Sequence, residues 1–131
     1  MKNVKLNTSL KAGFSLVEML VVIAIIGIIA AIAIPNIGNL NDSARDAAAK
    51  RNAQSVASVL NAAVAAGADL GTLTDGASII DKAEAGVSPA DGAFQGKNFT
   101  SGEIDDDEEA KAASYLSWDG TNKQVVYDAG S

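Results

Sequence analysis

The hydrophobic pattern of the chain is dominated by one long apolar run near its start. Between Met19 and Ile34 there is no charged and no strongly polar residue, and the run counted from Phe14 is 21 residues long. A helix of that length rises about 30 Å, which is the thickness of the hydrocarbon core of a bilayer. The pattern therefore predicts a membrane-spanning helix over residues 14–35, with Pro35 at its end.

After Pro35 the pattern becomes periodic. Apolar residues recur at i, i+3 and i+4 spacing, which predicts an amphipathic helix over residues 36–66 that packs under a globular head. The predicted packing stripe comprises Ile37, Leu40, Ala44, Ala48, Val56, Val59, Leu60, Ala63 and Val64. The predicted solvent face carries Asp42, Arg45, Asp46, Lys50, Arg51, Asn52 and Ser55. Gly67 ends the pattern in the manner of a C-cap glycine.

Shorter elements are predicted in the head, residues 67–131. One helix begins at residues 74–76 and ends at Gly86, residues 88–103 form a loop with a short strand near Phe99, and a second helix begins in the acidic run 105–109. Strands at 115–118 and 123–127 form a hairpin, which is expected to lie on residues 53–64 and to bury Leu116, Trp118, Val125 or Tyr127. The fold class is α+β, with a long N-terminal helix packed against a small antiparallel sheet and short helices.

The composition excludes several classes of chemistry. The chain has 131 residues, which leaves room for one small domain beside the span. It contains neither cysteine nor histidine, so disulfides, Cys/His zinc sites and Ser-His or Cys-His catalytic pairs are excluded. We therefore expect no enzyme activity and no cofactor.

Charge is distributed unevenly. Residues 1–13 carry Lys2, Lys5 and Lys11 and no acid, which places the N-terminus in the cytoplasm by the positive-inside rule and the head outside it. Residues 67–131 carry four lysines and thirteen acids, a net charge of −9. Such a head repels phosphate backbones, so a nucleic-acid partner is not expected.

The residues Gly13-Phe14-Ser15-Leu16-Val17-Glu18, behind a short basic leader, resemble the class III signal of type IV pilins and pseudopilins. The resemblance implies a pilin-like fold, cleavage by prepilin peptidase between Gly13 and Phe14, and methylation of the new amino group. It also implies a filament in or from the inner membrane. The expected partners are identical or related pilin subunits, prepilin peptidase, an inner-membrane assembly platform and membrane lipid.

Glu18 is the acid of this signal and stands close to the start of the apolar run. An ionised carboxylate costs about 3 kcal/mol at the centre of a bilayer and less near the interface. We expect Glu18 to pair with the Phe14 amine of a neighbouring subunit and so to set axial register, a role that the resemblance also implies. The alternative is that Glu18 only reaches up to the lipid headgroups.

Gly27 and Pro35 are candidate assembly residues. Gly27 forms a small-xxx-small pair with Ala31, which permits close helix approach in lipid. Pro35 has no N–H, so the carbonyl of Ala31 loses its helical partner. Residues 27–35 are therefore predicted to be the weak part of the helix, in a region where the helices of pilin filaments stretch or melt.

The acidic run is the one candidate metal site in the sequence. Asp105, Asp106 and Asp107 could supply oxygen ligands to calcium, and some pseudopilins bind calcium in the head. The spacing lacks the alternating acids and the glycine of an EF-hand loop. We favour a solvated helix start over a calcium site.

The function favoured by these features is a structural subunit of a type IV pilus-like filament. The small cysteine-free head favours a pseudopilin of a type II secretion system. A type IV pilin of an extracellular fibre, for adhesion, motility or DNA uptake, remains open. A signal-anchored periplasmic binding protein or enzyme is the alternative of another class.

Overall fold

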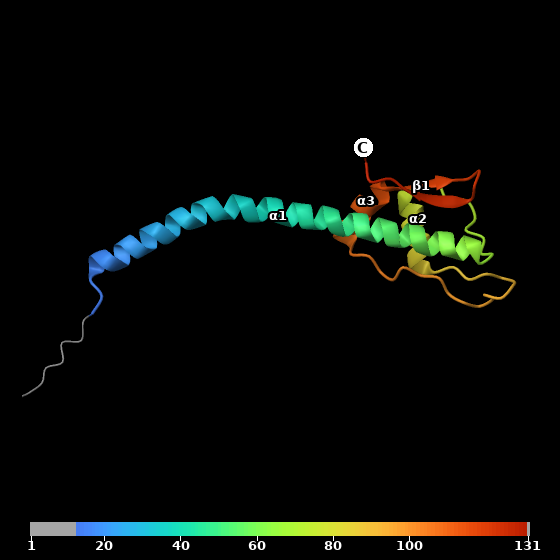
Figure 1. Cartoon of the computed structure of the whole chain (residues 1–131), viewed down its shortest axis with the longest axis horizontal. Helices are drawn as coiled ribbons and strands as arrows, with labels where there is room; N and C mark the ends of the chain where they lie inside the picture. The colour runs from blue at the N-terminus through green and yellow to red at the C-terminus, as the bar shows by residue number, and fades with distance from the viewer. Residues whose placement is uncertain (1–12, 131) are drawn as a thin grey trace, which may run out of the picture. The chain divides into compact units, whose positions relative to one another are not determined.

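A computed structural model describes residues 13–130 of the chain, which fall into two compact units divided between Asn39 and Leu40. One helix, α1 (Leu16–Ala65), passes from the first unit into the second (Figure 1). The helix predicted over residues 14–66 is therefore confirmed to within two residues at either end, and it runs through both Gly27 and Pro35. The predictions made for Lys2, Lys5 and Lys11 lie outside the described residues.

The first unit consists, from Leu16 onward, of the apolar part of α1. Its large aliphatic side chains are exposed, and the most apolar window of the helix has a mean hydropathy of 3.0 with no residue buried in the protein. Among the residues that the structure describes, α1 is the one helix whose length and composition suit a membrane crossing. Such a surface matches lipid or another apolar helix and does not match water.

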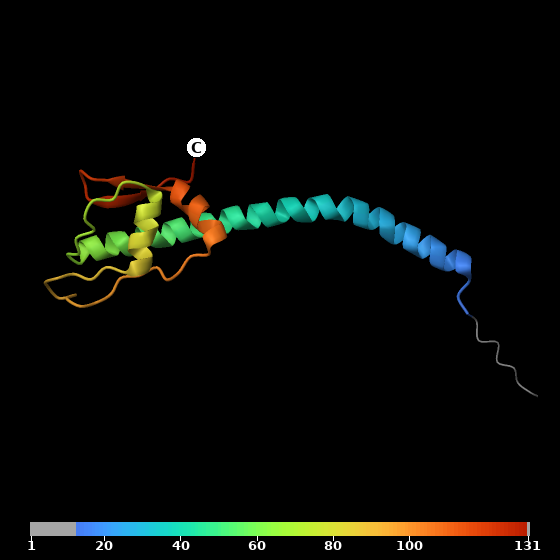
Figure 2. The same ribbon diagram turned by 180° about the vertical axis from the view of Figure 1, so that it is seen from behind.

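The second unit builds its elements around the C-terminal part of α1. They are α2 (Gly76–Ala85), α3 (Asp106–Ser114), β1 (Leu116–Asp119) and β2 (Gln124–Tyr127). The strands pair antiparallel, with Leu116 opposite Tyr127 and Trp118 opposite Val125. In both Figure 1 and Figure 2, the short helices and the hairpin lie beside the last turns of α1.

α1 ends at a glycine, as predicted. Gly67 has a φ of +95°, and its N–H donates to the carbonyl of Val64, while the N–H of Ala68 donates to the carbonyl of Ala63. This pair of hydrogen bonds is a Schellman motif, which satisfies carbonyls that the last turn would leave open. The chain can then reverse and return toward α2.

The core of the second unit comes from α1, from α2 and the segments that flank it, from α3 and from the hairpin. Its buried members are Ala49, Ala53, Val56, Ala57, Leu60, Ala63, Ala68, Leu70, Leu73, Ile79, Ile80, Ala83, Val87, Ile104, Ala112, Leu116 and Val125. Trp118 and Tyr127 are partly buried against it. The prediction that the hairpin buries side chains of this set is confirmed for Leu116 and Val125.

The predicted packing stripe of α1 is correct in its second half and wrong in its first. Val56, Leu60 and Ala63 are buried. Ile37, Leu40 and Ala44 are exposed, and the positions buried before Val56 are Ala49 and Ala53. Alanines stand at many positions around this part of the helix, so the periodic signal is weak there, and the core of the second unit begins only at Ala49.

The predicted solvent face of α1 was also partly wrong, because Asp46 and Asn52 form hydrogen bonds with residues outside α1. Asp46 accepts a hydrogen bond from the Tyr115 hydroxyl at 2.6 Å. It also forms an ion pair with Lys50, one turn along α1, at 3.1 Å. The Asn52 amide donates to Glu108 at 2.8 Å. Polarity alone did not reveal these bonds, since the partners stand more than fifty residues away in the sequence.

α2 begins and ends where predicted, and α3 begins in the acidic run as predicted. Asp75 is the N-cap of α2 and forms a reciprocal capping box with Ser78, and Gly86 is its C-cap. Asp105 is the N-cap of α3 and accepts from the N–H of Asp107 at 3.1 Å. The strand predicted near Phe99 is a single antiparallel bridge to Val87.

A candidate processing and assembly site

The first turn of α1 is held by a capping box between Ser15 and Glu18. The N–H of Ser15 donates to Oε2 of Glu18 at 2.8 Å, and the N–H of Glu18 donates to Oγ of Ser15 at 3.1 Å. The N–H of Met19 donates to the Ser15 carbonyl at 3.2 Å, which makes Ser15 the N-cap. Glu18 thus lies at the positive end of the helix dipole, where an ionised carboxylate is favoured.

Ser15 was not among the predicted site residues. A serine followed three residues later by glutamate, just before an apolar run, is the sequence signature of a capping box, and that spacing was visible. The box gives Glu18 a structural role in addition to the predicted pairing between subunits, because its carboxylate fixes where α1 begins. One oxygen, Oε2, is occupied by Ser15, and in the described part of the chain Oε1 accepts no hydrogen bond.

Gly13 and Phe14 precede the helix and are accessible. No atom lies within 4 Å of the point where a Cβ of Gly13 would stand, and Phe14 is 82% exposed. A protease must draw the scissile bond into an extended conformation in its own site, so a bond outside the helix and beside a glycine is a suitable substrate. Cleavage there leaves the capping box intact, since Ser15 and Glu18 both follow the cut.

Glu18 also borders a shallow apolar depression on α1. The depression has a volume of about 390 Å³ and is lined by Phe14, Val17, Glu18, Met19, Val21 and Val22. A neighbouring apolar helix or a lipid chain fits such a surface. The carboxylate is therefore the polar group of an otherwise apolar contact surface.

Gly27 and Pro35 lie farther along the same helix. No atom approaches the Cβ position of Gly27 within 4 Å, so this face of α1 is open to another helix. Pro35 stands inside α1 without ending it. The weakness predicted for residues 27–35 stays a prediction.

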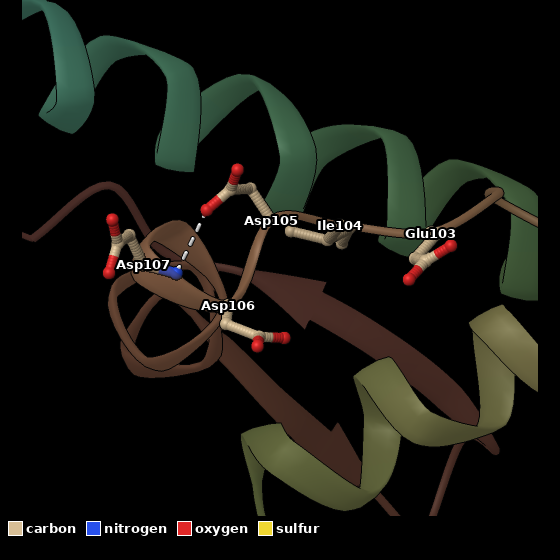
Figure 3. A pocket seen from close by; sticks show the side chains of 5 residues that line it. All are labelled: Glu103, Ile104, Asp105, Asp106 and Asp107. Carbon is tan, nitrogen blue, oxygen red and sulfur yellow. Dashed lines mark hydrogen bonds between the residues drawn. The ribbon is translucent and has the colours of Figure 1, made fainter.

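Four acidic residues of the second unit border a separate, open hollow of about 610 Å³, which is lined by Glu103, Ile104, Asp105, Asp106 and Asp107. In Figure 3, Asp105 turns toward the start of α3, Asp106 points to the other side, and Asp107 points away from both. Asp107 also lies 3.8 Å from Arg45. Within residues 13–130, no group of three or more carboxylates is arranged to share a metal ion.

The first turn of α1 therefore combines a processing signal with a helix suited to a membrane, which is the arrangement that defines pilin-like subunits. Residues 8–34 match the model of the prokaryotic N-terminal methylation motif, which is characteristic of type IV pilins and pseudopilins. The match includes Gly13, Phe14, Ser15, Glu18 and Gly27 and ends before Pro35. The chain thus carries the class III signal, which supports processing by prepilin peptidase and agrees with anchoring in the inner membrane.

Comparison of the chain with curated proteins and with solved structures gave no match. The methylation motif is therefore the shared feature on which the functional argument rests, and residues 35–131 contribute through their own structure.

Proposed function

We propose that the chain is a structural, non-catalytic subunit of a type IV pilus-like filament, assembled through the N-terminal part of α1. The observation that carries the proposal is the position of Glu18: one carboxylate, in the first turn of an exposed apolar helix, directly after an accessible Gly13–Phe14 bond. A glutamine would cap the first turn equally well, so a helix that served only as an anchor would have no need of the charge on Glu18.

Assembly follows from the charges that processing creates. Cleavage after Gly13 frees an amine on Phe14, and methylation leaves that amine positive. In the filament, the amine of an incoming subunit meets Oε1 of a Glu18 already in place, while Oε2 remains on Ser15. In surroundings of low dielectric constant an unpaired carboxylate is costly, so subunits out of register are disfavoured.

We further propose that the filament is the pseudopilus of a type II secretion system, with the head in the periplasm and an inner-membrane platform as assembly partner. The small cysteine-free head supports this version over an extracellular fibre. A deletion strain separates the two: retention of secreted enzymes in the periplasm is expected, whereas loss of surface fibres with normal secretion would identify a type IV pilin.

Mass spectrometry of the mature N-terminus tests the proposal at its base. The expected species begins with N-methylated Phe14. A mature chain that retains Gly13, or one cut within the apolar run, would instead identify a signal-anchored protein of another class.

A further inference from the structure

A second hollow, of about 730 Å³, opens on the surface of the second unit. Its walls are the C-terminal end of α1, the returning segment 68–72 and the turn of the hairpin. It is separate from the first turn of α1 and from the acidic hollow of Figure 3, with which it shares no lining residue.

Trp118, the single tryptophan of the chain, lines this hollow from β1. It is partly buried against the core, but its indole nitrogen is not buried and forms no hydrogen bond within residues 13–130. A Cβ on Gly120 would stand 3.5 Å from that nitrogen, so the glycine leaves the edge of the ring uncovered. The hollow therefore offers an aromatic surface together with an N–H donor.

Two groups of opposite charge line the same hollow. Oδ1 of Asp69 accepts from the N–H of Gly71 at 2.9 Å, and its other oxygen accepts no bond within residues 13–130. Lys123, whose φ of 52° lies in the left-handed region, supplies an ammonium group that forms no ion pair in that range. A carboxylate only accepts and an ammonium only donates, so a ligand that satisfies both must carry donors and acceptors together, as hydroxyl groups do.

Charge narrows the class of ligand further. Residues 67–131 carry a net charge of −9, which disfavours an anion, and Lys123 in the wall disfavours a simple cation. We propose that the hollow binds a neutral sugar unit of a glycan, with an apolar face of the ring on Trp118 and hydroxyl groups on Asp69 and Lys123. In a filament, one such site per subunit would raise the avidity for a repeating glycan.

The single tryptophan makes the test direct. The full chain is purified in an amine-oxide detergent, because glucoside and maltoside detergents would compete, and is titrated with neutral oligosaccharides of glucose, mannose and N-acetylglucosamine. A saturable change in tryptophan fluorescence is expected with at least one series. Asp69→Asn and Lys123→Gln should each weaken it about tenfold, the loss expected for one hydrogen bond to a charged group.

Two further variants serve as controls. Phe94→Ala removes an aromatic ring that is 51% exposed and does not line the hollow, so it should bind like the parent chain. Trp118→Phe, tested by co-sedimentation with an insoluble polysaccharide, should bind less while keeping the parent melting temperature to within a few degrees.

Three outcomes would overturn the inference. The first is no saturable fluorescence change with any sugar series, and the second is binding by the Asp69 and Lys123 variants as tight as that of the parent chain. The third is a fluorescence change produced by short neutral peptides and not by sugars. The last would identify a peptide-docking surface. None of these outcomes bears on N-terminal processing, so the filament proposal would stand or fall separately.

Discussion

At the scale of single residues, Ser15 and Glu18 cap α1, and Glu18 is also the residue proposed to pair with a neighbouring subunit. Their reciprocal hydrogen bonds fix the start of α1, and Oε1 of the same carboxylate accepts no hydrogen bond within residues 13–130. The family signal predicted Glu18 as an important residue but not its bond to Ser15, which the Ser-x-x-Glu spacing indicates. Two variants of neighbouring residues follow from this geometry.

Gly13→Val should leave unprocessed precursor in the membrane. Valine adds a branched side chain at the residue before the cut, where the glycine now gives a protease unhindered access to the backbone. Gly13→Ala is the matched control and should be processed more completely than the valine variant. Mass spectrometry and immunoblotting of membranes measure the ratio of the two forms, and normal maturation of Gly13→Val would refute this reading of the signal.

Ser15→Ala should be cleaved normally but give fewer filaments. The variant loses the acceptor of the Glu18 N–H, a cap worth about 1 kcal/mol, so the first turn frays and the carboxylate is held less firmly. Ser15→Thr keeps the hydroxyl and should assemble close to the parent level. If Ser15→Ala and Ser15→Thr assembled equally well, the capping box would have no part in assembly.

At the scale of elements, polar side chains tie α1 to the C-terminal elements of the second unit. Asp46 and Lys50 meet Tyr115, and both side-chain groups of Asn61 bond the backbone of Val125 in β2 at 2.8 Å. Residue patterns predicted the existence and type of these elements, since caps and turn residues act locally. They did not predict the ties, because a bond between positions 61 and 125 depends on how the hairpin docks.

Asn61→Ala should lower the stability of the second unit by about 2 kcal/mol. The amide provides both a donor and an acceptor to the outward-facing groups of Val125, and the alanine leaves both partly buried groups without a partner. Ser58→Ala, one turn away on an exposed position of α1, is the matched control. The unfolding midpoints of the two variants in denaturant are compared by Trp118 fluorescence. Equal midpoints would show that the Asn61 bonds do not stabilise the second unit.

The cluster at Tyr115 gives the stability a defined pH dependence. The Tyr115 hydroxyl and then Lys50 lower the pKa of Asp46 below its ordinary 3.8, while the hydrogen bond to Asp46 raises the pKa of Tyr115 above 10.0. The pKa of Lys50 is raised above 10.5 by Asp46. The contribution of Asp46 is therefore present above about pH 4 and lost as the pH falls through its folded pKa, whereas those of Tyr115 and Lys50 are lost as the pH rises above about 10.

Tyr115→Phe should make the free energy of unfolding depend less on pH at both the acidic and the alkaline end. It removes the bond that links the Asp46 carboxylate to the tyrosine, so stability should fall less steeply below pH 4 and less steeply above pH 10. Tyr127→Phe is the matched control, since the Tyr127 hydroxyl makes no hydrogen bond in the described chain and its ring lies 6.4 Å from that of Tyr115. Identical limbs in Tyr115→Phe and the parent chain would contradict this assignment.

At the scale of the whole molecule, two units serve two environments. The first presents an apolar surface with one acid near its start, and the second presents an acidic surface over a small core. Length and hydropathy predicted an apolar span that ends at Pro35, and the structure divides the chain after Asn39. The part of α1 that the core covers was harder to predict, because alanines favour a helix equally on every side and do not mark which side is buried.

Filament assembly from Glu18 variants tests the central claim most directly. Glu18→Gln keeps the length and the hydrogen bonds of the capping box but removes the charge, so it separates the two tasks of the residue. Glu18→Ala removes both, and Glu18→Asp keeps the charge on a shorter side chain. Filament yield is measured by electron microscopy at membrane levels equalised by immunoblot.

All three variants are expected to insert into the membrane and to be processed. If the Glu18 charge sets register, Glu18→Gln and Glu18→Ala form few or no filaments, and Glu18→Asp retains part of the filament yield. The charge pair between Glu18 and the Phe14 amine is then what sets register. Normal filaments from Glu18→Gln at equal membrane levels would contradict the account and would reduce Glu18 to a helix cap.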